Sequence, residues 1–391
     1  MAERVYFDWN ATAPLRSEAR AAVLAALDLV GNPSSVHAEG RAAHQVIEKA
    51  RESVAALVGG DPRCVTFTSG GTEANMLALG PGAGGIGAPK HARLLVSAIE
   101  HPSVLAGGRF AAGVVEQIPV TAGGYVDLSA LAERLAALAR DGVGVPLVSL
   151  MLANNETGVI QPVAQAAEIV HRAGGLLHVD AVQGAGRIPI DINALGADLL
   201  TLSGHKIGAP KGVGALIRRH RDIAIDVLIA GGGQEGRLRA GTENVAGIAG
   251  FGAAAVAALR NLDRETTFLA GLRDRLEHEL KMSPATPTIF GEHAPRLPNT
   301  TLFSVPGVKA ETAVIALDLE GVAVSSGAAC SSGKVQPSHV LAAMGVEPEL
   351  AGGAVRISLG ADTTESDVES FQSAWNKVLS SLLKTQRTIA A

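Results

Sequence analysis

Two short segments in the middle of the chain place polar residues at the ends of apolar runs. The run Gly175–Leu177 is followed closely by Asp180, and the run Asp198–Leu202 is followed by Lys206. Each run has the length of a short buried strand. Open α/β sheets place their reactive groups at the carboxyl ends of their strands. The sequence therefore predicts an aspartate and a lysine at the same edge of a sheet.

This pair of side chains suits one cofactor, pyridoxal phosphate, which needs a lysine for a Schiff base and an acidic partner for its pyridinium nitrogen. Lys206 precedes Ile207–Pro210, so we expect it to face a cleft, where desolvation favours the neutral amine. A lone lysine is more often a solvated charge. Asp180 needs a partner if it is buried, and a helix N-cap role is as well supported as a cofactor role.

The segment Ser69–Thr72 connects an expected strand to an expected helix. Gly71 and Thr72 would let backbone N–H groups approach a phosphate at a helix N-terminus. Ser203 and His205 could reach the same phosphate. Taken alone, a glycine-rich turn with Thr72 as the N-cap is the preferred interpretation, and His205 could equally be an ordinary strand-end histidine.

Three further polar residues follow other expected strands. His101, before Pro102, could stack on a cofactor ring and relay protons, or be an ordinary loop histidine. Asn155 could bond a ring hydroxyl or fix a turn beside Gly158. The fork-shaped guanidinium of Arg356 suits a substrate carboxylate, although a structural ion pair is a fair alternative.

Cys330 lies in the small, polar, glycine-flanked stretch Ser325–Gly333, a composition that predicts an accessible loop and suits a nucleophile. Cys64 opens an expected strand, and we expect it to be buried and inert. Two cysteines in 391 residues make no disulfide framework. The sequence therefore predicts a reducing, cytoplasmic location.

Strand-like and helical patterns alternate from about Arg16 to Gly250, which predicts an α/β fold with a mostly parallel sheet and helices on both faces. After about Leu259 a long helix and shorter alternating strands indicate a smaller α+β unit. We expect a large cofactor-binding domain at 16–259, and a small domain made of 1–15 and 260–391 that carries the cysteine loop. The expected elements are helices at 41–58, 74–79 and 128–140, strands at 64–68, 94–97, 147–151, 300–304 and 354–358, and a surface loop at 80–87.

Composition excludes several classes of function. The net charge is −5, and charges are scattered, so no basic stripe for nucleic acid and no polybasic membrane anchor is present. The start of the sequence lacks a positive region followed by an apolar one, so we expect no signal peptide. Apolar stretches such as Ala21–Val30 are too short to cross a bilayer.

Taken together and in this order, the motifs resemble those of the cysteine desulfurases, pyridoxal phosphate enzymes related to the class V aminotransferases. The likeness runs nearly end to end. Its segments are Tyr6–Pro14, Asn32–His37, Thr68–Asn75, Glu100–His101, Asn154–Gly158, His178–Gln183, Ser203–Lys206, Arg239–Thr242 and Ser325–Gly333.

The resemblance implies a fold-type I pyridoxal phosphate transferase with a seven-stranded sheet, and it implies roles by position. Lys206 would carry the Schiff base, Asp180 would pair with the ring nitrogen, and His101 would stack on the ring and act as acid–base. Gln183 and Asn155 would bond the ring oxygen. The remaining cofactor contacts, to the phosphate, would come from Gly71, Thr72, Ser203 and His205, with Thr242 reaching the cofactor of the neighbouring subunit in a homodimer.

On the substrate side, the resemblance implies that Arg356 binds the carboxylate of L-cysteine, helped by Asn32 or Asn155. Cys330 would take the sulfur as a persulfide, releasing L-alanine. We expect no resident metal, although Cys330 could ligate an iron–sulfur cluster transiently through its persulfide. The context of Cys330 resembles the first group of the family, whose members supply iron–sulfur scaffolds, and leaves open a housekeeping or a nitrogen-fixation role.

Partners and alternatives follow from the same residues. The sulfur acceptor would be an iron–sulfur scaffold or another sulfur-acceptor protein. A selenocysteine lyase or another class V aminotransferase-like enzyme is the first alternative, and Cys330 disfavours a plain aminotransferase. A non-catalytic scaffold is the second, which the presence of Lys206, Asp180, His101 and Cys330 together disfavours.

Overall fold

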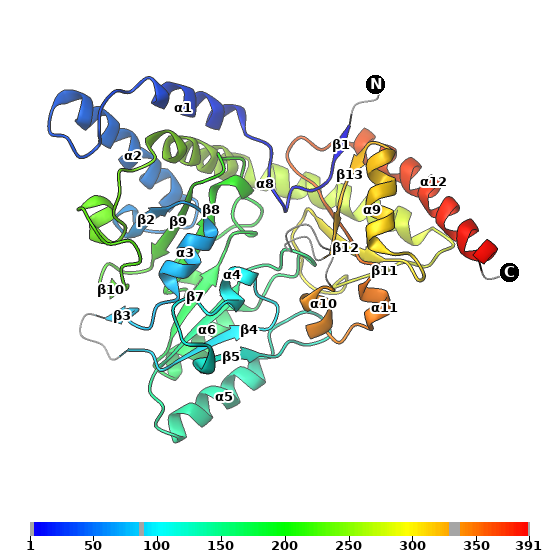
Figure 1. Cartoon of the computed structure of the whole chain (residues 1–391), viewed down its shortest axis with the longest axis horizontal. Helices are drawn as coiled ribbons and strands as arrows, with labels where there is room; N and C mark the ends of the chain where they lie inside the picture. Colours follow the sequence, from blue (N-terminus) through cyan, green and yellow to red (C-terminus); the bar gives the residue numbers. More distant parts are fainter. Residues whose placement is uncertain (1–3, 86–89, 328–336, 390–391) are drawn as a thin grey trace.

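The computed structural model describes residues 4–85, 90–327 and 337–389. Two sheets form the centres of two lobes, and helix α8 (Val245–Lys281) extends from one lobe into the other (Figure 1). Cys330 and its neighbours, the expected nucleophile loop, lie outside the described residues.

The larger lobe is built on a sheet of seven strands. Strand β9 is antiparallel to both of its neighbours, and the other pairs are parallel, as the sequence predicts. Most of the strand residues are buried, because helices cover both faces. In order across the sheet the strands are β2 (Val65–Thr68), β9 (Gly214–Arg218), β8 (Leu199–Ser203), β7 (Leu176–Asp180), β6 (Pro146–Met151), β4 (Arg93–Ser97) and β5 (Val115–Ile118).

The helices around this sheet follow the apolar periodicity of the sequence. Helix α5 has the predicted bounds, and α2 begins before its predicted start because His37 Nδ1 accepts a hydrogen bond from Gly40 N and caps it. Helices α1 and α2 pack against α8. A Cβ at Gly252 of α8 would lie 2.6 Å from Ala50 Cα, so the glycine allows close contact with α2. The helices are α1 (Ser17–Leu27), α2 (Ala38–Ala56), α3 (Gly71–Ala78), α5 (Leu128–Arg140) and α6 (Val163–Arg172).

The smaller lobe contains a four-stranded antiparallel sheet with a core that includes Phe303, Phe371 and Trp375. The N-terminal strand β1 (Val5–Tyr6) pairs in parallel with β13 (Val322–Ala323) in this lobe. The other elements here are β11 (Thr288–Ile289), β12 (Thr300–Ser304), β15 (Val355–Ser358), β14 (Ser325–Ser326), α9 (Ala310–Leu319), α10 (His339–Ala343), α11 (Pro348–Ala351) and α12 (Glu365–Ile389).

Helix α8 continues without a break across the predicted domain boundary at 259/260. The change in the sequence pattern near this boundary therefore reflects a change in the elements that α8 packs against. The division of the chain into two domains stays a prediction. Among the described residues, α8 is also the one helix with the length and apolarity of a membrane span, and 61% of its apolar window is buried within the protein.

Short elements connect these units. The prediction of a surface loop at 80–87 is partly wrong, because β3 (Gly84–Gly85) pairs with β10 (Ile223–Ala224). Helix α3 begins at Gly71, three residues before its predicted start at Ala74. The remaining short elements are α4 (Pro102–Leu105), α7 (Ile192–Leu195), η1 (Pro62–Cys64), η2 (Ala112–Val114), η3 (Gly204–Lys206) and η4 (Gln234–Arg237).

Candidate active site

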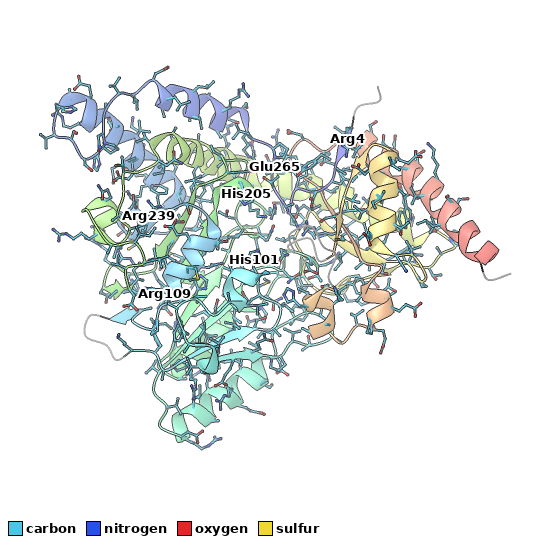
Figure 2. The ribbon with its side chains drawn as sticks, viewed as in Figure 1. Arg4, His101, Arg109, His205, Arg239 and Glu265 are labelled. Atoms are coloured by element: carbon cyan, nitrogen blue, oxygen red, sulfur yellow. The ribbon has the colours of Figure 1, made fainter. Side chains whose placement is uncertain are left out.

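A cavity of about 480 Å³ lies at the carboxyl ends of β6, β7 and β8, and residues of the N-terminal segment and of β15 complete its wall. Figure 2 shows His101 and His205, two of its lining residues, at the centre of the molecule. The predicted site residues that line this cavity are Gly71, Thr72, His101, Asn155, Asp180, Gln183, Ser203, His205, Lys206 and Arg356.

Lys206 and Asp180 reach the cavity from neighbouring parallel strands. Lys206 follows β8 in η3, and its Nζ donates hydrogen bonds to Asn10 O at 2.6 Å and to Ala11 O at 2.8 Å. Asp180 ends β7; its Oδ1 accepts from Val182 N at 3.0 Å. Asp180 therefore fixes a local turn and lines the cavity, and the expected helix N-cap role is wrong, because no helix begins between Asp180 and Ile192.

The N-terminus of α3 forms one end of the cavity. Thr72 is not the N-cap, because the helix begins at Gly71 and Gly70 holds the N-cap position. A Cβ at Gly71 would lie 3.1 Å from Val182 Cγ2 and 3.3 Å from Ser203 Cβ, so the glycine allows this helix end to approach β8 closely. Backbone N–H groups of a first helical turn attract anions. This end of the cavity therefore suits a phosphate.

His205 also lines the cavity and is neutral at neutral pH. Burial, together with the positive charges of Lys206, Lys211 and Arg187, lowers its pKa to about 4. Its Nδ1 lies 3.2 Å from Thr12 Oγ1. A neutral imidazole offers a hydrogen bond to an anion without adding a charge.

His101 is held in one orientation by a chain of hydrogen bonds that sequence reasoning missed. Its Nδ1 accepts from Ser103 N at 3.2 Å and lies 2.7 Å from Ser103 Oγ. Asn75 Nδ2 donates to Ser103 Oγ and to Asp180 Oδ2, both at 2.9 Å. Burial lowers the pKa of His101, so the ring is neutral with its proton on Nε2. The sequence signal for Asn75 was its place at the end of the Thr68–Asn75 motif, and the signal for Ser103 was its position two residues after His101.

Arg356 is buried on β15 and has an ion pair, as its alternative interpretation expects. Its Nη2 donates to Asp8 Oδ1 at 2.7 Å, and its Nη1 donates to Asn155 O at 3.0 Å. Its Nε is buried without a hydrogen-bond partner among the described residues. A guanidinium has five N–H donors, so the ion pair with Asp8 leaves others available. Arg356 also lines the cavity, where these donors could bind a ligand.

Two buried glutamates near the cavity were not predicted. Glu100 Oε1 accepts from Met151 N at 2.7 Å, and burial, followed by the charge of Asp180, raises its pKa well above the ordinary value. Glu156 Oε2 accepts from Ser338 Oγ at 2.5 Å, and burial raises the pKa of Glu156 to about 7. In the described part of the chain, no group of three His, Cys, Asp or Glu side chains is arranged to hold a metal ion.

Among the described residues, Asn32 and Thr242 were expected in the site and do not line this cavity; Asn32 is exposed, and its Oδ1 accepts from Ser34 N at 2.9 Å. Thr242 is exposed and lines a separate one of about 280 Å³, together with Ser69 and Gly212. Its expected role toward a neighbouring subunit stays a prediction. Cys330 lies outside the described residues.

The cavity fits pyridoxal phosphate in charge and in donor set. A helix N-terminus with close backbone approach suits the phosphate, Lys206 suits a covalent link, and Asp180 suits a pyridinium nitrogen. Lys211 and Arg356 add positive charge to the wall, which favours an anionic cofactor and an anionic substrate.

Comparison with known proteins gives the class to which the fold and site belong. Residues 5–371 match the aminotransferase class-V family. The chain belongs to this family and, within it, to the cysteine desulfurases, which are pyridoxal phosphate enzymes with the fold-type I architecture.

Individual relatives resemble the chain over almost its whole length. It is 42% identical to "Cysteine desulfurase IscS" of Dictyoglomus turgidum, over 94% of this chain and 92% of the relative. It is 42% identical to a cysteine desulfurase of Cereibacter sphaeroides, over 94% and 93%. The solved structure of a NifS-like protein from Rickettsia africae ESF-5 has 38% identity and a TM-score of 0.86, covering 97% of this chain and 100% of that one.

Proposed function

We propose that this enzyme is a cysteine desulfurase that converts L-cysteine to L-alanine and transfers the sulfur to Cys330 as a persulfide. The observation that carries the proposal is one cavity that holds Lys206, Asp180 and Arg356, in a chain whose sequence also supplies Cys330 in a small, polar stretch. The relatives named cysteine desulfurase support the same reaction.

When bound, pyridoxal phosphate supplies an electron sink that acidifies the substrate α-carbon and allows sulfur to depart. Lys206 would hold it through a covalent bond from Nζ, and the Asp180 carboxylate would keep a proton on the ring nitrogen. Gly71, Thr72, Ser203 and His205 would hold the phosphate.

The protein groups around the substrate would bind it and move protons. Arg356 would bind the substrate carboxylate through donors that its pairing with Asp8 and Asn155 leaves available. His101 is neutral, with Nδ1 occupied by Ser103, so it would donate or accept a proton at Nε2.

Sulfur transfer would need the thiol of Cys330, the substrate and the electron sink that the cofactor supplies. The Cys330 thiolate attacks the substrate sulfur, and an S–S bond forms as the C–S bond breaks. The electron pair of the C–S bond goes to the carbon, which takes a proton, so the products are alanine and a persulfide. A thiol reductant or an acceptor protein then removes the sulfur.

The proposal also covers the oligomeric state of the enzyme, its location in the cell and the acceptor of the sulfur. The enzyme would act as a homodimer in the cytoplasm, with Thr242 reaching the neighbouring subunit's cofactor, and would pass sulfur to an iron–sulfur scaffold or another acceptor protein. A selenocysteine lyase is the alternative, because the same residues would bind L-selenocysteine.

The test is the release of alanine and sulfide from L-cysteine with a thiol reductant, run beside L-selenocysteine. Cys330→Ala should bind cofactor and release no sulfide, whereas Cys64→Ala, which removes the buried cysteine, should keep wild-type activity. Sulfide release by Cys330→Ala at near the wild-type rate would refute the role of Cys330. Activity on L-selenocysteine alone would favour the alternative.

A further inference from the structure

Arg187 is a buried arginine beside the cavity whose partners are neutral oxygens. It follows β7, and 8% of its surface is exposed. Its Nη1 donates to Gln183 O at 2.9 Å and to Gln183 Oε1, and its Nη2 donates to Trp9 O at 3.3 Å. No carboxylate of the described residues forms an ion pair with it. A buried guanidinium with neutral partners is costly, so its position needs an explanation.

The charge on Arg187 persists at neutral pH. Burial, together with the charge of Arg356, lowers the pKa of Arg187 to about 9. Thr266 Oγ1 donates to Arg187 O at 2.9 Å and fastens this turn to α8. Arg187 therefore places a fixed positive charge behind the cavity wall.

The contact with Gln183 decides which end of the Gln183 amide faces the cavity. A guanidinium has donors and no acceptor, so only the amide oxygen of Gln183 can face Arg187. The amide NH₂ group must then point the other way, where Nε2 donates to Asn10 O at 3.1 Å. Asn10 O also accepts from Lys206 Nζ, so Gln183 Nε2 and the lysine amine share one acceptor.

We propose that Arg187 is a positioning residue that locks Gln183 with its N–H donors toward the cavity, so that the site presents a donor and a positive field to an anionic oxygen on the cofactor ring. This inference rests on the proposed function, in which Gln183 contacts the ring oxygen. Without Arg187, the Gln183 amide could rotate and present its oxygen, which would repel the same anion.

The sign of the pH effect follows from the charges. Arg187 repels a proton held at Lys206 Nζ and stabilises an anionic ring oxygen, and both effects favour loss of that proton. Removing Arg187 should therefore move the pH-dependent change in the cofactor's visible absorption to higher pH. The other charged or titratable groups facing this region, which all variants keep, are Asp8, Glu73, His101, Asp180, His205, Lys211 and Arg356.

The experiment is a spectrophotometric pH titration of holoenzyme, together with the dissociation constant of pyridoxal phosphate. In Arg187→Met the midpoint should rise by about one pH unit, and the dissociation constant should rise about tenfold, as for one lost hydrogen bond to a charged group. Arg187→Lys keeps a charge and offers only donors, so its midpoint should stay near that of wild type.

Two further variants cover the cases in which Arg187→Met fails to fold or in which loss of any partly buried arginine shifts the midpoint. Gln183→Glu retains a partner for Arg187 but offers no donor, so its midpoint must rise even if Arg187→Met fails to fold. Arg109→Met removes a half-buried arginine that also donates to backbone carbonyls, away from the cavity (Figure 2), and should leave the midpoint unchanged.

Other results would overturn the inference. They are a wild-type midpoint and affinity in folded Arg187→Met, an unchanged midpoint in Gln183→Glu, or a shift in Arg187→Lys as large as that in Arg187→Met. Each leaves the proposed function standing. Wild-type protein that takes up no pyridoxal phosphate would overturn both together.

Discussion

Replacing Glu156 with glutamine should make the protein more stable at alkaline pH, because this carboxyl is costly to ionise where it lies. Glu156 is 4% exposed, and its hydrogen bond from Ser338 links the segment that follows β6 to the N-cap of α10. Burial outweighs the hydrogen bond from Ser338 and the charge of Arg356, so the pKa of Glu156 is raised from 4.5 to about 7.

The magnitude follows from linkage between protonation and folding. The folded state binds the Glu156 proton more tightly than the unfolded state, so the resulting stability is fully present below pH 4.5 and is lost as the pH rises through 7. The rise in pKa corresponds to about 3 kcal/mol, of which about 2.5 kcal/mol is lost between pH 5 and pH 8. Glutamine does not titrate, and its amide oxygen can still accept from Ser338.

The assay is thermal or urea unfolding of wild type and Glu156→Gln at pH 5, 6, 7 and 8, at one protein concentration. The stability of the variant relative to wild type should rise steadily by about 2.5 kcal/mol across this range. Glu133→Gln, which changes an exposed glutamate on α5, is the matched control and should show no such trend. A stability difference for Glu156→Gln that is constant or falls with pH would refute the reasoning.

Three other substitutions test the site and its support. Lys206→Ala should lose the visible absorption band, and borohydride reduction should no longer fix the cofactor to the chain; a mass increase after reduction would contradict this. Arg356→Gln should raise the KM for L-cysteine about tenfold or more, as loss of a charge-assisted hydrogen bond predicts, with the cofactor absorbance kept; an unchanged KM would assign Arg356 to structure alone. Gly360→Ala would place a Cβ 1.8 Å from Trp9 Cδ2 and should cost about 3 kcal/mol of unfolding free energy, whereas Gly271→Ala, which meets nothing within 4 Å, should cost none.

Much of the fold could be predicted because the strands are short, apolar and separated by helices of clear period. The bounds of α5 follow directly from its pattern. Helix starts were harder to predict: α3 begins at Gly71 with a glycine N-cap, and α2 begins at Ala38, before its predicted start, although the His37 side chain caps it. The continuity of α8 was also missed, because its surroundings change along its length while its helical geometry does not.

The site was predictable where a residue follows a strand, because parallel strands bring their ends to one edge. Asp180 and Lys206 meet in this way, since β7 and β8 are parallel neighbours. The chain that links Asp180, Asn75, Ser103 and His101 was not predictable, because hydrogen bonds between side chains far apart in sequence depend on packing.

The sequence alone determined the types of reactive group, their order along the chain and the strand ends that carry them, because these depend on local pattern. It also supplied Cys330, the residue that distinguishes sulfur transfer from other reactions of amino acids. Only the tertiary structure decided the protonation state and the hydrogen-bond partners of each group. Burial makes His101 and His205 neutral and raises the pKa of Glu156. The packing of the chain surrounds the Arg187 guanidinium with neutral oxygens. These effects depend on desolvation and distance, which arise only when remote segments pack together.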